Sequence, residues 1–102
     1  MPDYIRFYQS AVDPADVEEM QRLFVDDVVP AFTACAGCLG IELAVTLEPN
    51  AGGLVEGMAI SRWSSLEDMV AALASHQVQG ALVRVRQLLR QEPVSKVLQV
   101  LF

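Results

Sequence analysis

Alternating apolar and polar positions at the start of the chain predict a strand over residues 4–9. Ile5 and Phe7 fall on one face of this strand, and Tyr4, Arg6 and Tyr8 fall on the other. Successive side chains of a strand point to opposite sides, so these two sets should meet different surroundings.

A helix is predicted to follow this strand directly. Asp13 can cap it, Pro14 suits its first position, and acidic residues follow in the first turn. Pro30 interrupts the helical pattern, so we expect a kink or a break there and a short continuation to residue 35. Gly37 is a natural terminator. The buried stripe of this helix is marked by apolar residues at helical spacing, namely Val17, Met20, Phe24, Val28 and Ala31.

Two further strands are predicted around the strongest turn signal of the chain. Residues 39–48 alternate between apolar and polar or small side chains, and residues 54–63 form a second strand-like run. The five residues between them, Pro-Asn-Ala-Gly-Gly, indicate a hairpin with a longer loop. Both strands are only partly polar on their second face. We therefore expect helices to cover one side of the sheet and a partner to cover the other.

A second helical region is predicted from residue 64 onward. Ser64 and Ser65 are each followed three residues later by an acidic residue, so either serine can open a capping box. Two apolar stripes in this region do not join across residues 75–77, which indicates a bend or a break. Pro93 ends the helix, and residues 94–102 form a last strand.

The predicted order is strand, helix, strand, strand, helix, strand. With right-handed crossovers, this order gives a ferredoxin-like α+β fold: an antiparallel sheet with both helices on one face. The 102 residues suffice for a single domain that spans residues 1–102.

Composition narrows the classes of partner. Hydrophobic residues make up 53% of the chain, more than a small isolated domain needs, which favours a second buried surface such as a subunit interface. The net charge of −6 argues against nucleic acids and anionic membranes. The charged N-terminus and the lack of a long apolar run predict a soluble, cytoplasmic protein.

Two short motifs resemble those of the antibiotic-biosynthesis-monooxygenase-like (ABM) family. The step Ala-Gly-Cys-Leu-Gly-Ile at residues 36–41 resembles the family's opening of the second strand, and Arg-Trp-Ser-Ser-Leu-Glu at residues 62–67 resembles its Trp-x-Ser step. The spacing of the elements also agrees. The resemblance implies a homodimer in which two sheets form an α+β barrel. It also implies activities that include cofactor-independent oxygenation of aromatic or quinol-like compounds.

The chain departs from the family at several positions. A helical His that family members often carry is replaced here by Ala72, and His76 and Gln77 stand where a Pro and another His are common. The Asn, Trp and His pattern of the haem-degrading branch is absent, because the first Asn is Asn50 and the only Trp precedes the helix. Haem degradation is therefore not expected, and no cofactor or metal is predicted.

His76 is the predicted catalytic residue, because imidazole can act as a general base near neutral pH. Its replacement by Ala should then abolish turnover. The alternative is an exposed or capping His at a helix bend. The predicted substrate pocket lies between helices and sheet, with His76 as its polar group, and is lined by apolar and aromatic residues: Phe7, Phe24, Trp63, Met69 and Leu73.

Three other features have both a chemical and a structural interpretation. Cys35 and Cys38 have redox-motif spacing, but they follow a helix instead of opening one, so two packed thiols are the favoured interpretation. The hydroxyls of Tyr4 and Tyr8 can orient a ligand, although such residues more often pack at the edge of an interface. Arg62 is expected to pair across the hairpin with Glu42 or Glu56.

Two functions follow from the sequence. The first is a cofactor-independent monooxygenase that acts on an aromatic or polyketide/quinol-like small molecule. The second is a non-catalytic dimer that binds a small molecule or has a structural role. Binding of haem without its degradation, with His76 as the ligand, is a weaker third possibility.

Overall fold

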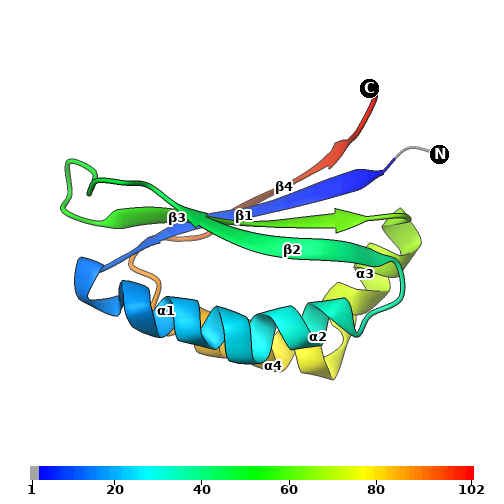
Figure 1. Cartoon of the computed structure of the whole chain (residues 1–102), viewed down its shortest axis with the longest axis horizontal. Coiled ribbons are helices and arrows are strands. Elements are labelled where there is room, and N and C mark those ends of the chain that lie inside the picture. Colours follow the sequence, from blue (N-terminus) through cyan, green and yellow to red (C-terminus); the bar gives the residue numbers. More distant parts are fainter. Residues whose placement is uncertain (1–2) are drawn as a thin grey trace.

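A computed structural model, which describes residues 3–102, contains one antiparallel sheet with helices packed on one of its faces (Figure 1). The four strands lie in the order β2-β3-β1-β4, and every neighbouring pair is antiparallel. This is the predicted ferredoxin-like α+β layout. The strands are β1 (Tyr4–Val12), β2 (Cys38–Val45), β3 (Val55–Trp63) and β4 (Val94–Gln99).

The first helical segment runs without a break from residue 14 to residue 33. The carboxylate of Asp13 accepts a hydrogen bond from the Ala15 N–H (2.9 Å), as the predicted cap requires. Of the kink or break expected at Pro30, the break does not occur. A π-helical turn precedes the proline, and the Val29 N–H donates to the Phe24 carbonyl five residues back. The segment comprises η1 (Pro14–Asp16), α1 (Val17–Leu23), the π turn η2 (Phe24–Val28) and α2 (Val29–Thr33).

The second helical region is divided in two at the predicted place. The helices α3 (Leu66–Ala74) and α4 (His76–Arg86) meet at Ser75. The Ser75 hydroxyl donates to the Ala72 carbonyl (2.6 Å) and accepts from the Val78 N–H (3.4 Å), so one side chain satisfies both helix ends. Ser65, not Ser64, caps α3 by accepting from the Asp68 N–H (3.1 Å).

Two strands are shorter than the sequence predicts, namely those expected at residues 39–48 and 94–102. β2 ends at Val45, and a turn follows in which the side-chain oxygen of Asn50 accepts from the N–H groups of Gly52 and Leu54. Leu47, which the alternation placed in the strand, is fully exposed. β4 ends at Gln99 instead of continuing to Phe102.

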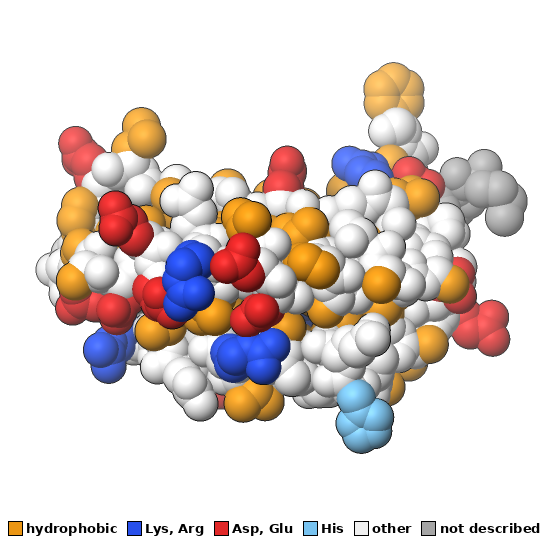
Figure 2. Space-filling view, turned by 60° about the horizontal axis from the view of Figure 1, so that its bottom comes forward, with side chains coloured by type: hydrophobic (Ala, Val, Ile, Leu, Met, Phe, Trp, Pro, Cys, Tyr) orange, Lys and Arg blue, Asp and Glu red, His pale blue; other side chains and the backbone are white. Residues whose placement is uncertain are grey.

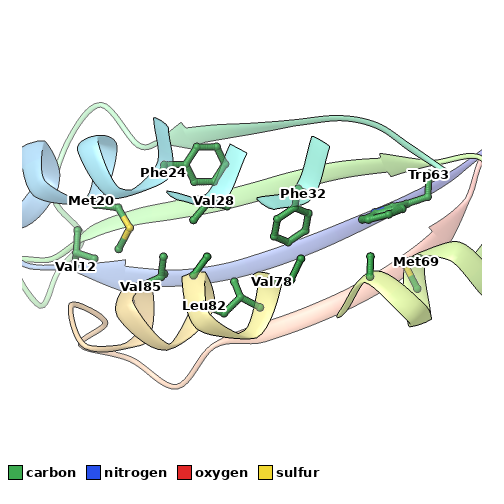
Figure 3. Packing of buried hydrophobic residues seen from close by; sticks show 12 residues of the cluster. Val12, Met20, Phe24, Val28, Phe32, Trp63, Met69, Val78, Leu82 and Val85 are labelled. Carbon is green, nitrogen blue, oxygen red and sulfur yellow. The ribbon is translucent and has the colours of Figure 1, made fainter. Parts of the chain in front are cut away.

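The core fills the space between the helices and the covered face of the sheet (Figure 3). Trp63 and Phe32 are almost completely buried, and their ring centroids lie 6.1 Å apart. The indole N–H of Trp63 donates to the Ser61 hydroxyl (2.9 Å). Among residues 3–102, no helix is both long and apolar enough to cross a membrane.

Within residues 3–102, no helix packs on the other face of the sheet. Pairing of β1 with β3 and β4 places a set of apolar side chains together there. These side chains are partly or largely exposed, and we call them the outer sheet face: Ile5, Phe7, Met58, Ile60, Val94 and Leu98.

Candidate functional site

A cavity of about 60 Å³ lies between the covered face of the sheet and the helices. Its helix wall is apolar and comes from α1, the π turn, α2 and α4, with Met20, Phe24, Val28, Phe32, Leu82 and Val85. Figure 3 shows these side chains projecting from the two helical segments, α1 to α2 and α4, into the space between them. Its sheet wall is mixed, because polar side chains of β1 and β3 point into it beside apolar ones: Arg6, Tyr8, Ser10, Ile41, Leu43, Ala59 and Ser61.

Arg6 contributes a positive charge to this wall. Its guanidinium carbon lies 5.1 Å from the centroid of the Tyr8 ring, a cation–π contact. Burial lowers the pKa of Arg6, the neighbouring Tyr8 opposes that effect, and the positive charge of Arg86 adds to it. The group nevertheless remains a cation at neutral pH. Within residues 3–102, no carboxylate lies within ion-pair distance of Arg6.

The hydroxyl of Tyr8 is enclosed and has no hydrogen-bond partner in the described part of the chain. A buried hydroxyl without a partner costs about 1–3 kcal/mol, so it requires an explanation. The two serines of the wall differ from it. Ser10 donates to the Gln91 carbonyl (2.7 Å), whereas Ser61 accepts from Trp63 and keeps its own hydrogen available.

Of the five residues predicted to line a pocket, only Phe24 lines this cavity. Phe7 lies on the outer sheet face, because alternation sends the side chains of Arg6 and Tyr8 inward and that of Phe7 outward. Trp63 and Met69 are buried in the core farther along the sheet, as Figure 3 shows, and Leu73 packs against that core. Trp63 is therefore a core aromatic, with an exposed fraction of 0%.

His76 is the first residue of α4 and is exposed. It does not line the cavity, and in Figure 2 the single His side chain, in pale blue, projects away from the surface. Its expected placement in the pocket is thus corrected. The break that exposes it was predicted, but the capping group at that break is Ser75, which leaves the imidazole free to point outward.

Two other sequence expectations concern charged and thiol side chains. Nη1 of Arg62 lies 3.8 Å from Oδ2 of Asp3. The predicted ion pair of Arg62 with Glu42 or Glu56 is therefore wrong. Cys35 and Cys38 are separate, partly buried thiols, and burial raises the pKa of Cys38. No cluster of three or more His, Cys, Asp or Glu suited to a metal ion occurs in residues 3–102.

The structure resembles solved structures over nearly its whole length. The Mycobacterium tuberculosis protein Rv0793 has 20% sequence identity and a TM-score of 0.72, with 100% of this chain and 97% of that chain covered. A mutant of SnoaB, a cofactor-independent oxygenase from Streptomyces nogalater, has 16% identity and a TM-score of 0.75, with 98% and 94% covered. A structure named antibiotic biosynthesis monooxygenase has 16% identity and a TM-score of 0.74, with 100% of both chains covered.

These likenesses show that the chain has the ABM fold, which the sequence motifs had predicted. At such low identity they show the fold alone. No family model and no curated protein matches the sequence.

Sequence reasoning did not place Arg6 and Ser61 at the cavity, which both of them line. The signal that could have found Arg6 was the alternation of β1, which places Tyr4, Arg6 and Tyr8 on one face. That face was not recognised as the covered one because the opposite face, with Ile5 and Phe7, is the more apolar. Ser61 carries no local signal, since its role depends on its cross-strand position opposite Arg6.

Proposed function

We propose that this protein is a cofactor-independent monooxygenase that acts on an aromatic or polyketide/quinol-like small molecule. The observation that carries the proposal is the cavity itself, an apolar space with fixed polar groups on one wall only. Apolar walls exclude water and bind a ring, while fixed dipoles stabilise charge that develops on it. The fold shared with the oxygenase SnoaB supports the same class of reaction.

The chemistry needs no group beyond the substrate and molecular oxygen. A suitable substrate loses a proton to give an electron-rich anion, which transfers electrons to oxygen. For anthrone, as an example, the acidic CH₂ becomes a carbonyl: one oxygen atom enters the product, anthraquinone, and the other leaves as water with the two hydrogens of the CH₂. The protein's contribution is to bind the anion and to exclude water.

Anthrone is also the probe for the test. With ¹⁸O₂ as the gas, we expect protein-dependent oxygen uptake and incorporation of one labelled atom into anthraquinone, measured by mass spectrometry. Gly57→Val should lower the rate at least tenfold, because Gly57 lines the cavity and the larger side chain would occupy part of it. The backbone position accepts a Cβ without a clash, since its nearest neighbour would be a side-chain carbon of Val45 at 3.6 Å. Anthrone oxidation at the rate of protein-free buffer would contradict the proposal.

Two variants at His76 test the catalytic role that the sequence predicted. His76 is exposed and lies outside the cavity, so His76→Ala and His76→Gln should both keep the wild-type rate. A loss of turnover in both variants, with unchanged folding, would instead restore His76 as the general base.

A non-catalytic binding or structural role is the second candidate. The observation in its favour is the small free volume of about 60 Å³, which holds only a few water molecules. On this alternative, the protein would form a stable dimer and would not accelerate oxygen uptake with any probe.

The proposal also includes a homodimer. The outer sheet face offers apolar side chains from three adjacent strands, with Val94 and Leu98 exposed by 59% and 44%. A second copy placed against this face would remove these side chains from water and would cover the sheet on its bare side.

A further inference from the structure

We propose that Arg6, Tyr8 and Ser61 form a binding site for an anionic oxygen atom, so that the cavity selects a flat apolar molecule with an ionised hydroxyl, a phenolate or an enolate. The inference names the substrate class for the proposed function and rests on it for the identity of the cavity as the substrate site.

The three side chains share one small area of the sheet wall. Arg6 and Ser61 are directly opposite each other in the pairing of β1 with β3, and Tyr8 is the next residue of β1 on the same face. Side chains directly opposite across two strands lie about 5 Å apart at their Cβ atoms, and alternate residues of a strand about 7 Å apart. All three side chains line the cavity, so a ligand that enters it would meet all three of them.

All three groups offer hydrogens to a ligand. A guanidinium has only donors, the acceptor of Ser61 is occupied by the Trp63 N–H, and the Tyr8 hydroxyl has a free hydrogen. A ligand oxygen that carries lone pairs and a negative charge complements such a set, whereas an ammonium or an amide N–H does not.

The charge of Arg6 lacks a counter-ion within the described residues. Four other arginines each lie near a carboxylate: Arg22 near Glu19 and Asp26, Arg62 near Asp3, Arg84 near Asp27, and Arg90 near Asp16. Besides burial and the neighbouring Tyr8, the pKa of Arg6 is affected by Arg86, which is also positive and lowers it further. A partly buried positive charge without a partner favours an anion in the adjoining space.

A ring-sized ligand needs more room than the cavity now provides. A groove of about 320 Å³ lies on the outer side of the same layer of side chains, and both spaces are bordered by Val12, Met20, Phe24, Leu43 and Val45. Met20 is unbranched and flexible, so on this proposal its rotation would join the two spaces. The anionic oxygen would then lie at the sheet and the apolar body would extend toward the groove.

The chemical consequence is a proton released by the ligand. A bound phenol ionises to phenolate, its proton passes to solvent, and Arg6 holds the pKa of the bound hydroxyl below that of the free compound. 4-Nitrophenol is a suitable probe because its phenolate is coloured and because it undergoes no oxygenation in the assay. Titrated by absorbance with excess protein, its apparent pKa should fall by at least one unit, equivalent to about tenfold tighter binding of the anion.

Three controls make the experiment specific. The neutral ether 4-nitroanisole should bind at least tenfold more weakly than the phenolate. Arg6→Met should abolish the pKa shift of 4-nitrophenol, since Met keeps an apolar stem but not the charge. Arg22→Met changes the net charge equally on the exposed surface of α1, and the shift should persist in it.

Equal binding of the ether, no detectable binding of the phenolate, or an unchanged shift in Arg6→Met would each overturn the inference. If Arg6→Met does not fold, Tyr8→Phe replaces it. This variant should lower the ratio of phenolate affinity to phenol affinity, which the pKa shift measures, by at least threefold. Anion binding without any oxygen uptake from anthrone would support this site and refute the monooxygenase. Anthrone turnover that is the same in Arg6→Met would support the enzyme and refute this site.

Discussion

At the scale of single residues, the covered face of β1 carries polar groups where a core would place apolar ones. Arg6 and Tyr8 cost folding free energy: one is a charge without a counter-ion in the described residues, and the other a hydroxyl without a partner there. Local rules are commonly violated at functional sites, and the cost of the violation is compensated elsewhere in the fold. This is why the pair suggests a site more strongly than the exposed His76 does.

The stability of Tyr8→Phe provides a direct measure of this cost. Removing the enclosed hydroxyl should leave the free energy of unfolding unchanged or raise it by about 1 kcal/mol, because the ring stays and an unpaired polar group disappears. Urea unfolding followed by circular dichroism would measure it. Tyr4→Phe is the matched control, since Tyr4 lies on the same strand face but its hydroxyl is not among the enclosed, unpartnered groups of the described residues, and it should show no gain. A loss of more than about 1 kcal/mol in Tyr8→Phe would mean that the hydroxyl has a partner after all.

The residue scale is also where sequence reasoning was weakest. Alternation correctly divided β1 into two faces, but hydrophobicity then suggested the wrong face as the covered one, and Phe7 was assigned to the pocket instead of Arg6. The reason is physical: a sheet expected to be covered on both sides has two apolar faces, and one strand cannot tell which of them the helices cover.

At the scale of elements, the joint between α2 and β2 shows how closely two elements pack. Gly37 adopts a φ of +80°, and a Cβ added to it would lie only 2.6 Å from the Cβ of Asp68 in the first turn of α3. Its carbonyl accepts from the Ser64 N–H (2.9 Å), which fixes the joint to the end of β3. Gly37 was predicted as a helix terminator, but the contact with α3 depends on tertiary packing that no local pattern records.

Replacing Gly37 by Ala should therefore destabilise the protein in two ways, through the backbone conformation and through the contact with Asp68. Gly53→Ala is the matched control, because Gly53 has almost the same φ, +79°, and no atom within 4 Å of an added Cβ. We expect about 1 kcal/mol of lost stability in Gly53→Ala and about 2–4 kcal/mol in Gly37→Ala, measured by urea unfolding. Equal losses in the two variants would show that α3 can move away from the joint.

The helices also show which local signals are sufficient. The division between α3 and α4 was predicted because two apolar stripes failed to join, and Ser75 satisfies both ends. The π turn was not predicted, because Pro30 indicates only that a regular hydrogen bond is missing. Whether the chain then breaks or inserts an extra residue into one turn depends on packing, here the burial of Phe24 and Val28.

At the scale of the whole molecule, one layer of helices covers one face of the sheet, and the other face is bare (Figure 1). The sequence predicted a second covered surface from the high apolar content and from the only partly polar second face of the two hairpin strands, residues 39–48 and 54–63. The order of the strands followed from the order of the elements and from the handedness of the crossovers.

Size-exclusion chromatography with light scattering should find a dimer at micromolar concentration. The double variant Phe7→Thr, Ile60→Thr should weaken dimerisation at least tenfold, because threonine suits a strand but adds a polar group to the outer sheet face. Val97→Thr is the control, since Val97 pairs with Arg6 and so lies on the opposite face of the same sheet. A wild-type monomer at these concentrations would contradict the dimer and the account of the apolar surplus.

The division of the cavity into a polar sheet wall and an apolar helix wall has a consequence for how such a protein can change over time. On the proposed function, the charge of the substrate would be recognised by two strands, and the shape of its carbon skeleton by separate helices that line the same cavity. Substitutions at Phe24, Val28 or Leu82 can therefore alter which skeletons fit while the anchoring of the oxygen is preserved. On this proposal, new substrate preferences would arise through successive substitutions in the helices, and every variant along the way would still bind the reacting oxygen.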